Sequence, residues 1–157
     1  NFMAKLAAIE GMPNGSFRLP TEAQWEYACR AGTDTAFCYG DDLDSSMANC
    51  NGDYPFGKGK KREARGKTVA VGQFKPNAWG VYDMHGNVWE WCADRYGEYD
   101  GDATDPSGAA LGSGRVARGG SWLNVPCGCR SACRSSGGPA AAVAAFGFRL
   151  SLPTGQQ

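Results

Sequence analysis

Apolar residues recur every three or four positions in two stretches of the chain, and both stretches predict amphipathic helices. The first covers residues 2–10, and the second lies between Thr21 and Gly32. Thr21 is a suitable N-cap, and Gln24 three residues later completes a capping box. Gly32 suits the position that follows the last helical turn. We therefore expect a well-defined helix between Thr21 and Gly32.

Short alternating apolar runs predict strands in the rest of the chain. They cover residues 68–74, 88–92, 116–118 and 148–151, and a tight turn is predicted at 84–87. The 23 glycines and 8 prolines favour a loop-rich fold with short elements over a helical bundle. No internal repeat or domain boundary is visible, so the 157 residues are expected to form one domain with its own core.

One stretch near the C-terminus, residues 123–146, shows neither a helical nor a strand period across its length. We call it the variable segment. It lies between two specific sequences, RGGSW at 118–122 and GFRL at 147–150. Loops on a rigid scaffold often carry binding functions, so we interpret this segment as an interchangeable surface between fixed ends.

The charge balance limits the classes of partner. Lys and Arg number 16, as do Asp and Glu, which gives a formal net charge of +0. Nothing therefore directs the chain to nucleic acid or to an anionic membrane. The longest apolar run, residues 140–146, is too short to span a bilayer, and no signal peptide is visible. The chain opens at Asn1 in the middle of a helical pattern, so we expect that preceding residues are missing.

The seven cysteines admit two interpretations. Their odd number does not compel a disulfide framework. Cys127, Cys129 and Cys133 could belong to a metal cluster, but the only histidine is His85 and no Cys-x-x-Cys pair occurs. Buried free thiols are the simpler alternative for most of them.

Four blocks of sequence resemble the formylglycine-generating enzyme, or sulfatase-modifying factor, family. They are FRLPTEAQWEYA at 17–28, NAWGVYDMHGNVWEW at 77–91, RGGSW at 118–122 and GFR at 147–149. The resemblance implies an α+β C-type lectin fold with a small twisted antiparallel sheet, two helices and much irregular chain. It also implies that residues 1–157 are a single domain that lacks the family's N-terminal strands.

Enzymes of this family oxidise a cysteine of a client sulfatase to formylglycine with two cysteines that bind copper. By position, the resemblance places these two at Asn124 and Cys129. A two-thiolate Cu(I) site needs both soft ligands, so the asparagine predicts a chain without enzymatic activity and without catalytic residues. Cys127 has the wrong spacing to replace the missing thiol. The alternatives are a copper-dependent oxidase of the formylglycine-generating type and an inactive relative that binds sulfatases.

Some family members bind calcium near the tryptophan-rich block. By position, the ligands here would be Asp83, the carbonyls of Gly86 and Val88, and Glu90. Such a set of oxygen atoms suits a hard cation, so a structural calcium ion is a candidate. The alternative is that Asp83 and Glu90 only satisfy backbone donors in a tight loop. No cofactor is required for the function predicted below.

The variable segment resembles the variable proteins of diversity-generating retroelements. Inert relatives of the enzyme carry many asparagines after RGGSW, and this chain has other residues at most of those positions. In such systems a reverse transcriptase mutates only template adenines, so asparagine codons never become Met, Trp, Lys, Gln or Glu. The segment contains none of these five types, although all occur elsewhere in the chain. A loop of small residues chosen for tight packing is the alternative explanation.

We therefore predict a non-enzymatic display or receptor protein whose variable segment binds a protein ligand or cell-surface target, exposed on a cell or phage. Exposed, mildly apolar side chains of this kind usually mark a protein-binding site. The predicted scaffold anchors are Trp122, Pro126, Arg130, Arg134 and Phe148. The predicted ligand-binding residues are Leu123, Asn124, Val125, Cys127, Gly128, Cys133, Ser135, Ser136, Gly137, Gly138, Ala140, Ala142, Ala144, Ala145 and Phe146.

Overall fold

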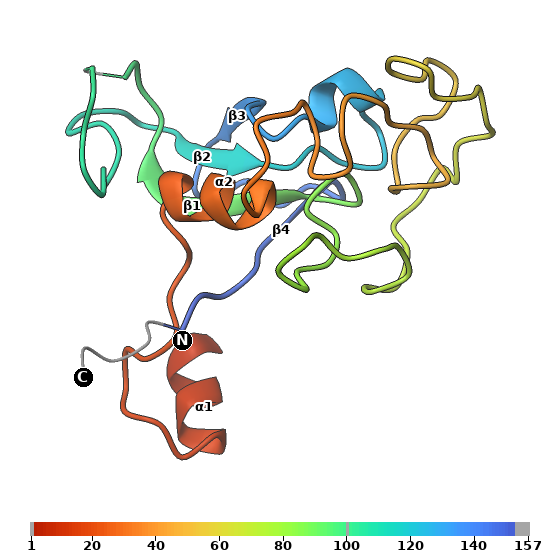
Figure 1. Ribbon diagram of the computed structural model, residues 1–157. Helices are drawn as coiled ribbons and strands as arrows, with labels where there is room; N and C mark the ends of the chain where they lie inside the picture. The colour runs from red at the N-terminus through yellow and green to blue at the C-terminus, as the bar shows by residue number, and fades with distance from the viewer. Residues whose placement is uncertain (1, 100, 153–157) are drawn as a thin grey trace.

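The computed structural model describes residues 2–99 and 101–152. Figure 1 shows a small sheet with helix α2 (Glu22–Arg30) beside it, surrounded by long loops, and helix α1 (Phe2–Ile9) set apart from the sheet. The remaining elements are β1 (Trp89–Arg95), β2 (Arg115–Arg118), the short 3₁₀-helix η1 (Pro126–Cys129), β3 (Arg134–Gly137) and β4 (Phe146–Gly147). Among the described residues, no helix is long and apolar enough to cross a membrane.

Helix α2 begins and ends as its sequence predicts. The Thr21 hydroxyl accepts a hydrogen bond from the Gln24 N–H, and the Gln24 side chain accepts one from the Thr21 N–H. At the other end, Ala31 adopts a left-handed backbone with φ of 47° and donates its N–H to the Tyr27 carbonyl. Gly32 follows with φ of 90°. The predicted capping box is confirmed.

The sheet is mixed, with strand order β3–β2–β1–β4. β2 runs antiparallel to both β1 and β3, whereas the two-residue β4 runs parallel to β1. The expected sheet was wholly antiparallel, and the orientation of this last strand differs. Because β3 and β4 lie on opposite edges, the chain between them, residues 138–145, must pass from one edge of the sheet to the other.

Two of the predicted strands are confirmed, and one is wrong. The runs 88–92 and 116–118 form the greater part of β1 and β2. Residues 68–74 form no strand, and Val71 is 82% exposed. Side chains accept hydrogen bonds from the backbone of this loop instead. The Asn87 side chain accepts one from the Val69 N–H, and the Asp83 carboxylate accepts one from the Gly72 N–H. An alternating pattern therefore produced no strand here, because no neighbouring strand pairs with it.

The chain end also pairs differently from the prediction. The final strand lies at Phe146–Gly147, before the predicted run 148–151. In that run, Ser151 forms an isolated antiparallel bridge with Arg18. This bridge brings the C-terminal end of the described chain beside the loop that leads into α2.

Two clusters of buried side chains form the core. The first joins α2 to the sheet and consists of Trp25, Cys29, Met84, Cys92 and Val116. The second lies among the loops and consists of Phe37, Leu43, Ala48, Cys50 and Cys129. Cys129 belongs to the variable segment, so the second cluster holds one end of η1 against the irregular part of the fold.

Candidate functional site

The variable segment contains more regular structure than its sequence indicates. After Trp122 the chain turns through η1, forms the edge strand β3 and crosses to β4 at the opposite edge (Figure 1). Ser135, Ser136 and Gly137 pair with β2, and Phe146 pairs with Trp89 of β1. The sheet therefore fixes the backbone at several positions predicted to bind ligand, while leaving side chains on an open edge.

The predicted ligand-binding residues differ in exposure. The exposed ones are Leu123, Cys127, Ser136, Gly138, Ala140, Ala142 and Ala144. The half-buried ones are Asn124, Val125, Gly128, Cys133, Ser135, Gly137 and Phe146. Ala145 is buried, and its carbonyl accepts the Trp89 N–H. The side chain of Ala145 is thus turned away from solvent, which corrects its place among the ligand-contacting residues.

Arg134, a predicted anchor, ties the start of β3 to helix α2. Its Nε and Nη2 donate to the Glu22 carboxylate at 2.7 and 2.9 Å, and its Nη1 donates to the Gly97 carbonyl at 3.0 Å. The guanidinium also lies over the Tyr99 ring, 4.1 Å from its centroid. Arg134 is therefore bonded within the protein and holds β3 in place.

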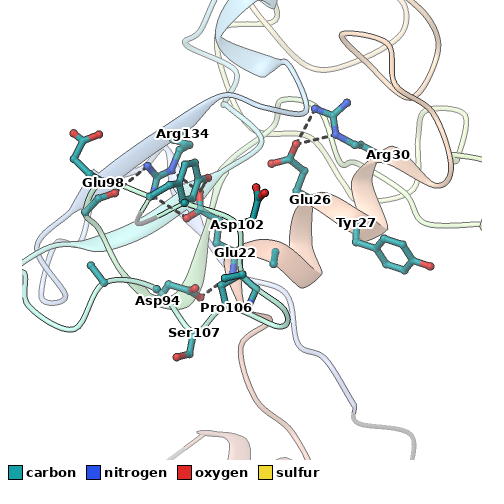
Figure 2. A pocket seen from close by; sticks show the side chains of 17 residues that line it. Glu22, Glu26, Tyr27, Arg30, Asp94, Glu98, Asp102, Pro106, Ser107 and Arg134 are labelled. Carbon is teal, nitrogen blue, oxygen red and sulfur yellow. Dashed lines mark hydrogen bonds and ion pairs between the residues drawn. The ribbon is translucent and has the colours of Figure 1, made fainter.

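A pocket of about 570 Å³ lies beside this ion pair, between α2 and the loop after β1. Figure 2 shows Arg134 and Glu22 directed toward each other, Asp94 directed to the start of α2, and Glu26 paired with Arg30. The Asp94 carboxylate accepts the Glu22 N–H at 2.8 Å. The sequence did not predict this pocket, because α2, β1 and a Gly/Asp-rich loop come together only in the fold.

Arg118 of the RGGSW block is a second anchor, which the sequence analysis missed. Its side chain is fully buried, pairs with Glu26 and donates to the Cys133 carbonyl at 2.6 Å. Its guanidinium lies over the Trp25 ring, 5.5 Å from the centroid. It therefore connects the variable segment to α2 through the sheet. The available signal was an arginine directly after the apolar pair Val116 and Ala117, since a buried charge requires partners.

The other predicted anchors divide into two pairs. Pro126 is buried in the first turn of η1, and the Trp122 N–H donates to the Asn87 carbonyl at 3.0 Å. Arg130, by contrast, is exposed and donates to the Cys127 carbonyl within its own turn. Phe148 is 52% exposed. The side chains of Arg130 and Phe148 lie at the surface, and their role as anchors stays a prediction.

The glycines of the RGGSW block bring the chain directly against η1. Gly120 has φ of 76°, and a Cβ atom there would lie 2.5 Å from the Cys129 Sγ and 3.0 Å from the Gly128 carbonyl oxygen. Gly138, within the variable segment, has nothing within 4 Å of the same position. A side chain at Gly120 would thus clash with η1, whereas Gly138 has room for one.

The only histidine, His85, connects η1 to the loop that contains Cys38. Its Nε2 accepts the Cys38 N–H at 3.0 Å, so its Nδ1 carries the proton and donates to the Cys129 carbonyl at 2.8 Å. His85 is 2% exposed, and the rings of Phe37 and Tyr39 meet it edge to face. Burial lowers the pKa of His85 from 6.5 to about 4, which keeps the ring neutral.

Asn124 and Cys129, the two positions at which the resemblance places copper-binding cysteines, do not form a two-thiolate site. The Asn124 Oδ1 accepts hydrogen bonds from the Ser121 hydroxyl at 2.7 Å and the Ser121 N–H at 3.1 Å. Cys129 is fully buried, and burial raises the pKa of its thiol well above the usual range. A hard amide oxygen engaged with a serine is not a soft copper ligand, so these residues do not fit a Cu(I) ion.

The predicted calcium ligands are only partly free to bind a cation. The Asp83 Oδ1 is buried without a hydrogen-bond partner, as an oxygen ligand would be. The Glu90 carboxylate, however, accepts hydrogen bonds from Arg149 at both oxygens and from the Trp25 indole N–H. Arg149 also donates to the Tyr82 carbonyl. A cation at this loop would have to displace Arg149 from Glu90, so the four predicted ligands do not fit as a set.

The thiols show no clustering of the kind a metal needs. Over residues 2–99 and 101–152, all seven cysteines are free, and no group of three or more His, Cys, Asp or Glu side chains could hold a metal ion. Cys29, Cys50, Cys92 and Cys129 are buried, whereas Cys127 is exposed.

The helix α2, the curled mixed sheet and the long loops form a C-type lectin fold of the formylglycine-generating type, as in the solved structures it resembles. The chain belongs to the family of the sulfatase-modifying factor enzyme 1-like domain, whose profile matches residues 2–152. It is 37% identical over 143 residues to the formylglycine-generating enzyme of Streptomyces coelicolor, a match covering 84% of this chain and 45% of that enzyme.

Two solved structures are also similar. Treponema denticola variable protein 1 matches with a TM-score of 0.72 at 38% identity, over 85% of this chain and 46% of that chain. PvdO from Pseudomonas aeruginosa matches with a TM-score of 0.74 at 33% identity, over 94% of this chain and 57% of that chain. The chain spans about half the length of the curated relatives it matches.

Proposed function

We propose that this chain is a non-enzymatic ligand-binding protein whose variable segment, residues 123–146, contacts protein targets and is diversified by a retroelement. One observation carries the proposal. The segment lacks the five residue types that adenine mutagenesis of asparagine codons cannot produce, and most of its predicted ligand-binding residues are exposed or half-buried. A similar solved structure bears the name variable protein.

Residues with a fixed position and residues with an exposed side chain alternate along the segment, and this arrangement supports the proposal. Arg134, Pro126 and Cys129 are held by ion pairs or burial, and none of them is among the predicted ligand-binding residues. Between them lie exposed side chains that few contacts constrain. A scaffold of this kind keeps its backbone course while surface side chains change, which is the physical requirement for a diversified binding surface.

The absence of oxidase activity is the second part of the proposal. Asn124 occupies the position of one copper-binding cysteine and bonds to Ser121, so a single buried thiol remains at this place. The alternative function is that of a copper-dependent oxidase, because several similar proteins are named formylglycine-generating enzyme. The alternative predicts tight Cu(I) binding that the Cys129→Ala variant loses, whereas the binding role requires no cofactor.

The test is a pair of matched display libraries. One randomises five exposed positions of the segment: Leu123, Cys127, Ser136, Gly138 and Ala140. The control randomises five exposed positions of another loop: Lys67, Thr68, Ala70, Val71 and Gln73. Each exposed substitution should change the free energy of unfolding by less than about 0.5 kcal/mol. Most members of both libraries should therefore fold.

Selection against a panel of purified proteins should enrich target-specific binders from the segment library at least about tenfold more often than from the control. Equal yields from the two libraries would show that the segment has no special role in binding. Loss of folding across the segment library would contradict the proposal in a different way, because the segment would then be structural.

A further inference from the structure

A second concave surface lies on the side of the molecule where helix α1 meets the sheet. It is a groove of about 790 Å³, bordered by α1, the chain leading into α2, strands β1 and β2, and residues near β4. Its apolar walls include Phe2, Leu19, Trp91, Pro139 and Phe148. Figure 1 shows α1 set apart from the sheet, and the groove lies on this side.

Several aromatic rings line the groove and remain partly open to water. Phe2 is 59% and Phe148 is 52% exposed, and their rings meet edge to face with centroids 5.7 Å apart. Trp91 is half-buried and packs against Phe146, with ring centroids 4.6 Å apart. Aromatic side chains gathered in a concavity are a frequent feature of binding sites for another protein.

The charges around the groove have one sign. Its lining contains Arg18 and Arg115 and no aspartate or glutamate. Within the described part of the chain, Arg18 is an exposed residue that takes part in no ion pair. Arg115 donates one N–H to the Ala93 carbonyl and interacts electrostatically with the Asp94 carboxylate, which lies outside the groove lining. By contrast, Arg118, Arg134 and Arg149 are each paired with carboxylates. A partner that fills the groove is therefore expected to bring its own negative charge.

We propose that this groove binds a peptide segment of another protein in which an aromatic or large aliphatic side chain lies next to a carboxylate. The apolar side chain would pack among Phe2, Trp91 and Phe148, and the carboxylate would pair with Arg18 or Arg115. Of the lining residues, only Pro139 belongs to the variable segment. The groove would thus hold a constant partner, independent of the targets of the variable segment.

The test is a selection from a random linear peptide library on immobilised wild-type chain, followed by affinity measurements on the consensus peptide by fluorescence polarisation. The expected consensus has an aromatic or large aliphatic residue adjacent to Asp or Glu. Replacing the acid by Lys should abolish binding, and Arg18→Gln and Phe148→Ala should each weaken it about tenfold or more. Binding should also weaken as salt is added, because the pairing is electrostatic.

The Arg130→Gln variant is the matched control, since Arg130 is an exposed arginine outside the groove and inside the variable segment. It should leave the affinity for the consensus peptide unchanged. A consensus without acids, or a consensus peptide whose affinity is lowered by Arg130→Gln but not by Arg18→Gln, would overturn the proposal. Concentration-dependent dimerisation that Phe148→Ala abolishes would also overturn it, because a second copy would then be the occupant.

The proposed roles of the groove and of the variable segment can be contradicted independently of each other. Loss of acidic-peptide binding would leave the segment library result untouched, and failure of the segment library would leave the groove intact. Arg18 is exposed, and its bridge to Ser151 uses backbone atoms that Arg18→Gln keeps, so this variant remains informative even if Phe148→Ala were to unfold the chain.

Discussion

The Arg118→Ala variant is expected to lose about 3–5 kcal/mol of its free energy of unfolding, the usual result of breaking a buried ion pair. The wild-type side chain is fully buried, pairs with Glu26 and donates to the Cys133 carbonyl. Its Nε lies 3.5 Å from the Glu22 carboxylate without hydrogen-bond geometry. Alanine would leave a cavity beside Trp25 and a carbonyl of the variable segment without its donor.

Urea denaturation followed by circular dichroism measures this loss directly, and Arg130→Ala is the matched control. Arg130 is also an arginine bonded to the segment, but it is exposed and its partner, the Cys127 carbonyl, lies in the same turn. Its replacement should change the free energy of unfolding by no more than about 0.5 kcal/mol. Equal losses in the two variants would contradict the assignment of Arg118 as the internal anchor.

Stability is also expected to fall as the pH is lowered from about 6.5 to about 4, because His85 must remain neutral in the fold. Its pKa is about 4 in the folded chain, against an ordinary value of 6.5. As the pH falls, His85 therefore takes up a proton in the unfolded chain before it does so in the folded chain. The contribution of neutral His85 to stability is complete above pH 6.5 and is lost as the pH approaches 4. The difference in pKa corresponds to about 3 kcal/mol.

The His85→Gln variant separates this contribution from those of the acidic residues. Its free energy of unfolding should be lower at neutral pH, since the pairing with the Cys38 N–H and the Cys129 carbonyl is weakened or lost. Between pH 6.5 and 4 it should show a shallower slope than the wild-type chain. A variant with the wild-type slope would mean that His85 does not remain neutral in the folded protein.

Local chemistry determined which elements could be predicted. Helix α2 followed from Thr21 and Gln24, whose hydrogen bonds involve only neighbouring residues. The run 68–74 alternates as a strand does, yet the loop has no partner strand and bonds to Asn87 and Asp83. Periodicity alone therefore misled where long-range pairing decides the outcome.

The variable segment shows the converse error. Residues 134–137 have no strand pattern, and they form β3 because β2 offers a register from Arg115 to Arg118. The groove near Phe148 and the ion pair between Arg134 and Glu22 could not be predicted from the sequence either, since each brings together residues far apart in the chain. By contrast, the asparagine at position 124, where the resemblance places a cysteine, is visible in the sequence itself and predicts the loss of oxidase activity.

The measurement that tests the central claim most directly is deep sequencing of the codons for residues 110–157 across many isolates of the source population. A diversified binding surface predicts that variation is confined to residues 123–146 and falls at adenine-bearing template positions. It also predicts that the buried Pro126, Cys129 and Ser131 stay constant. Constant codons throughout the segment would contradict the proposal, and the chain would then have to be treated as an altered relative of the formylglycine-generating enzymes.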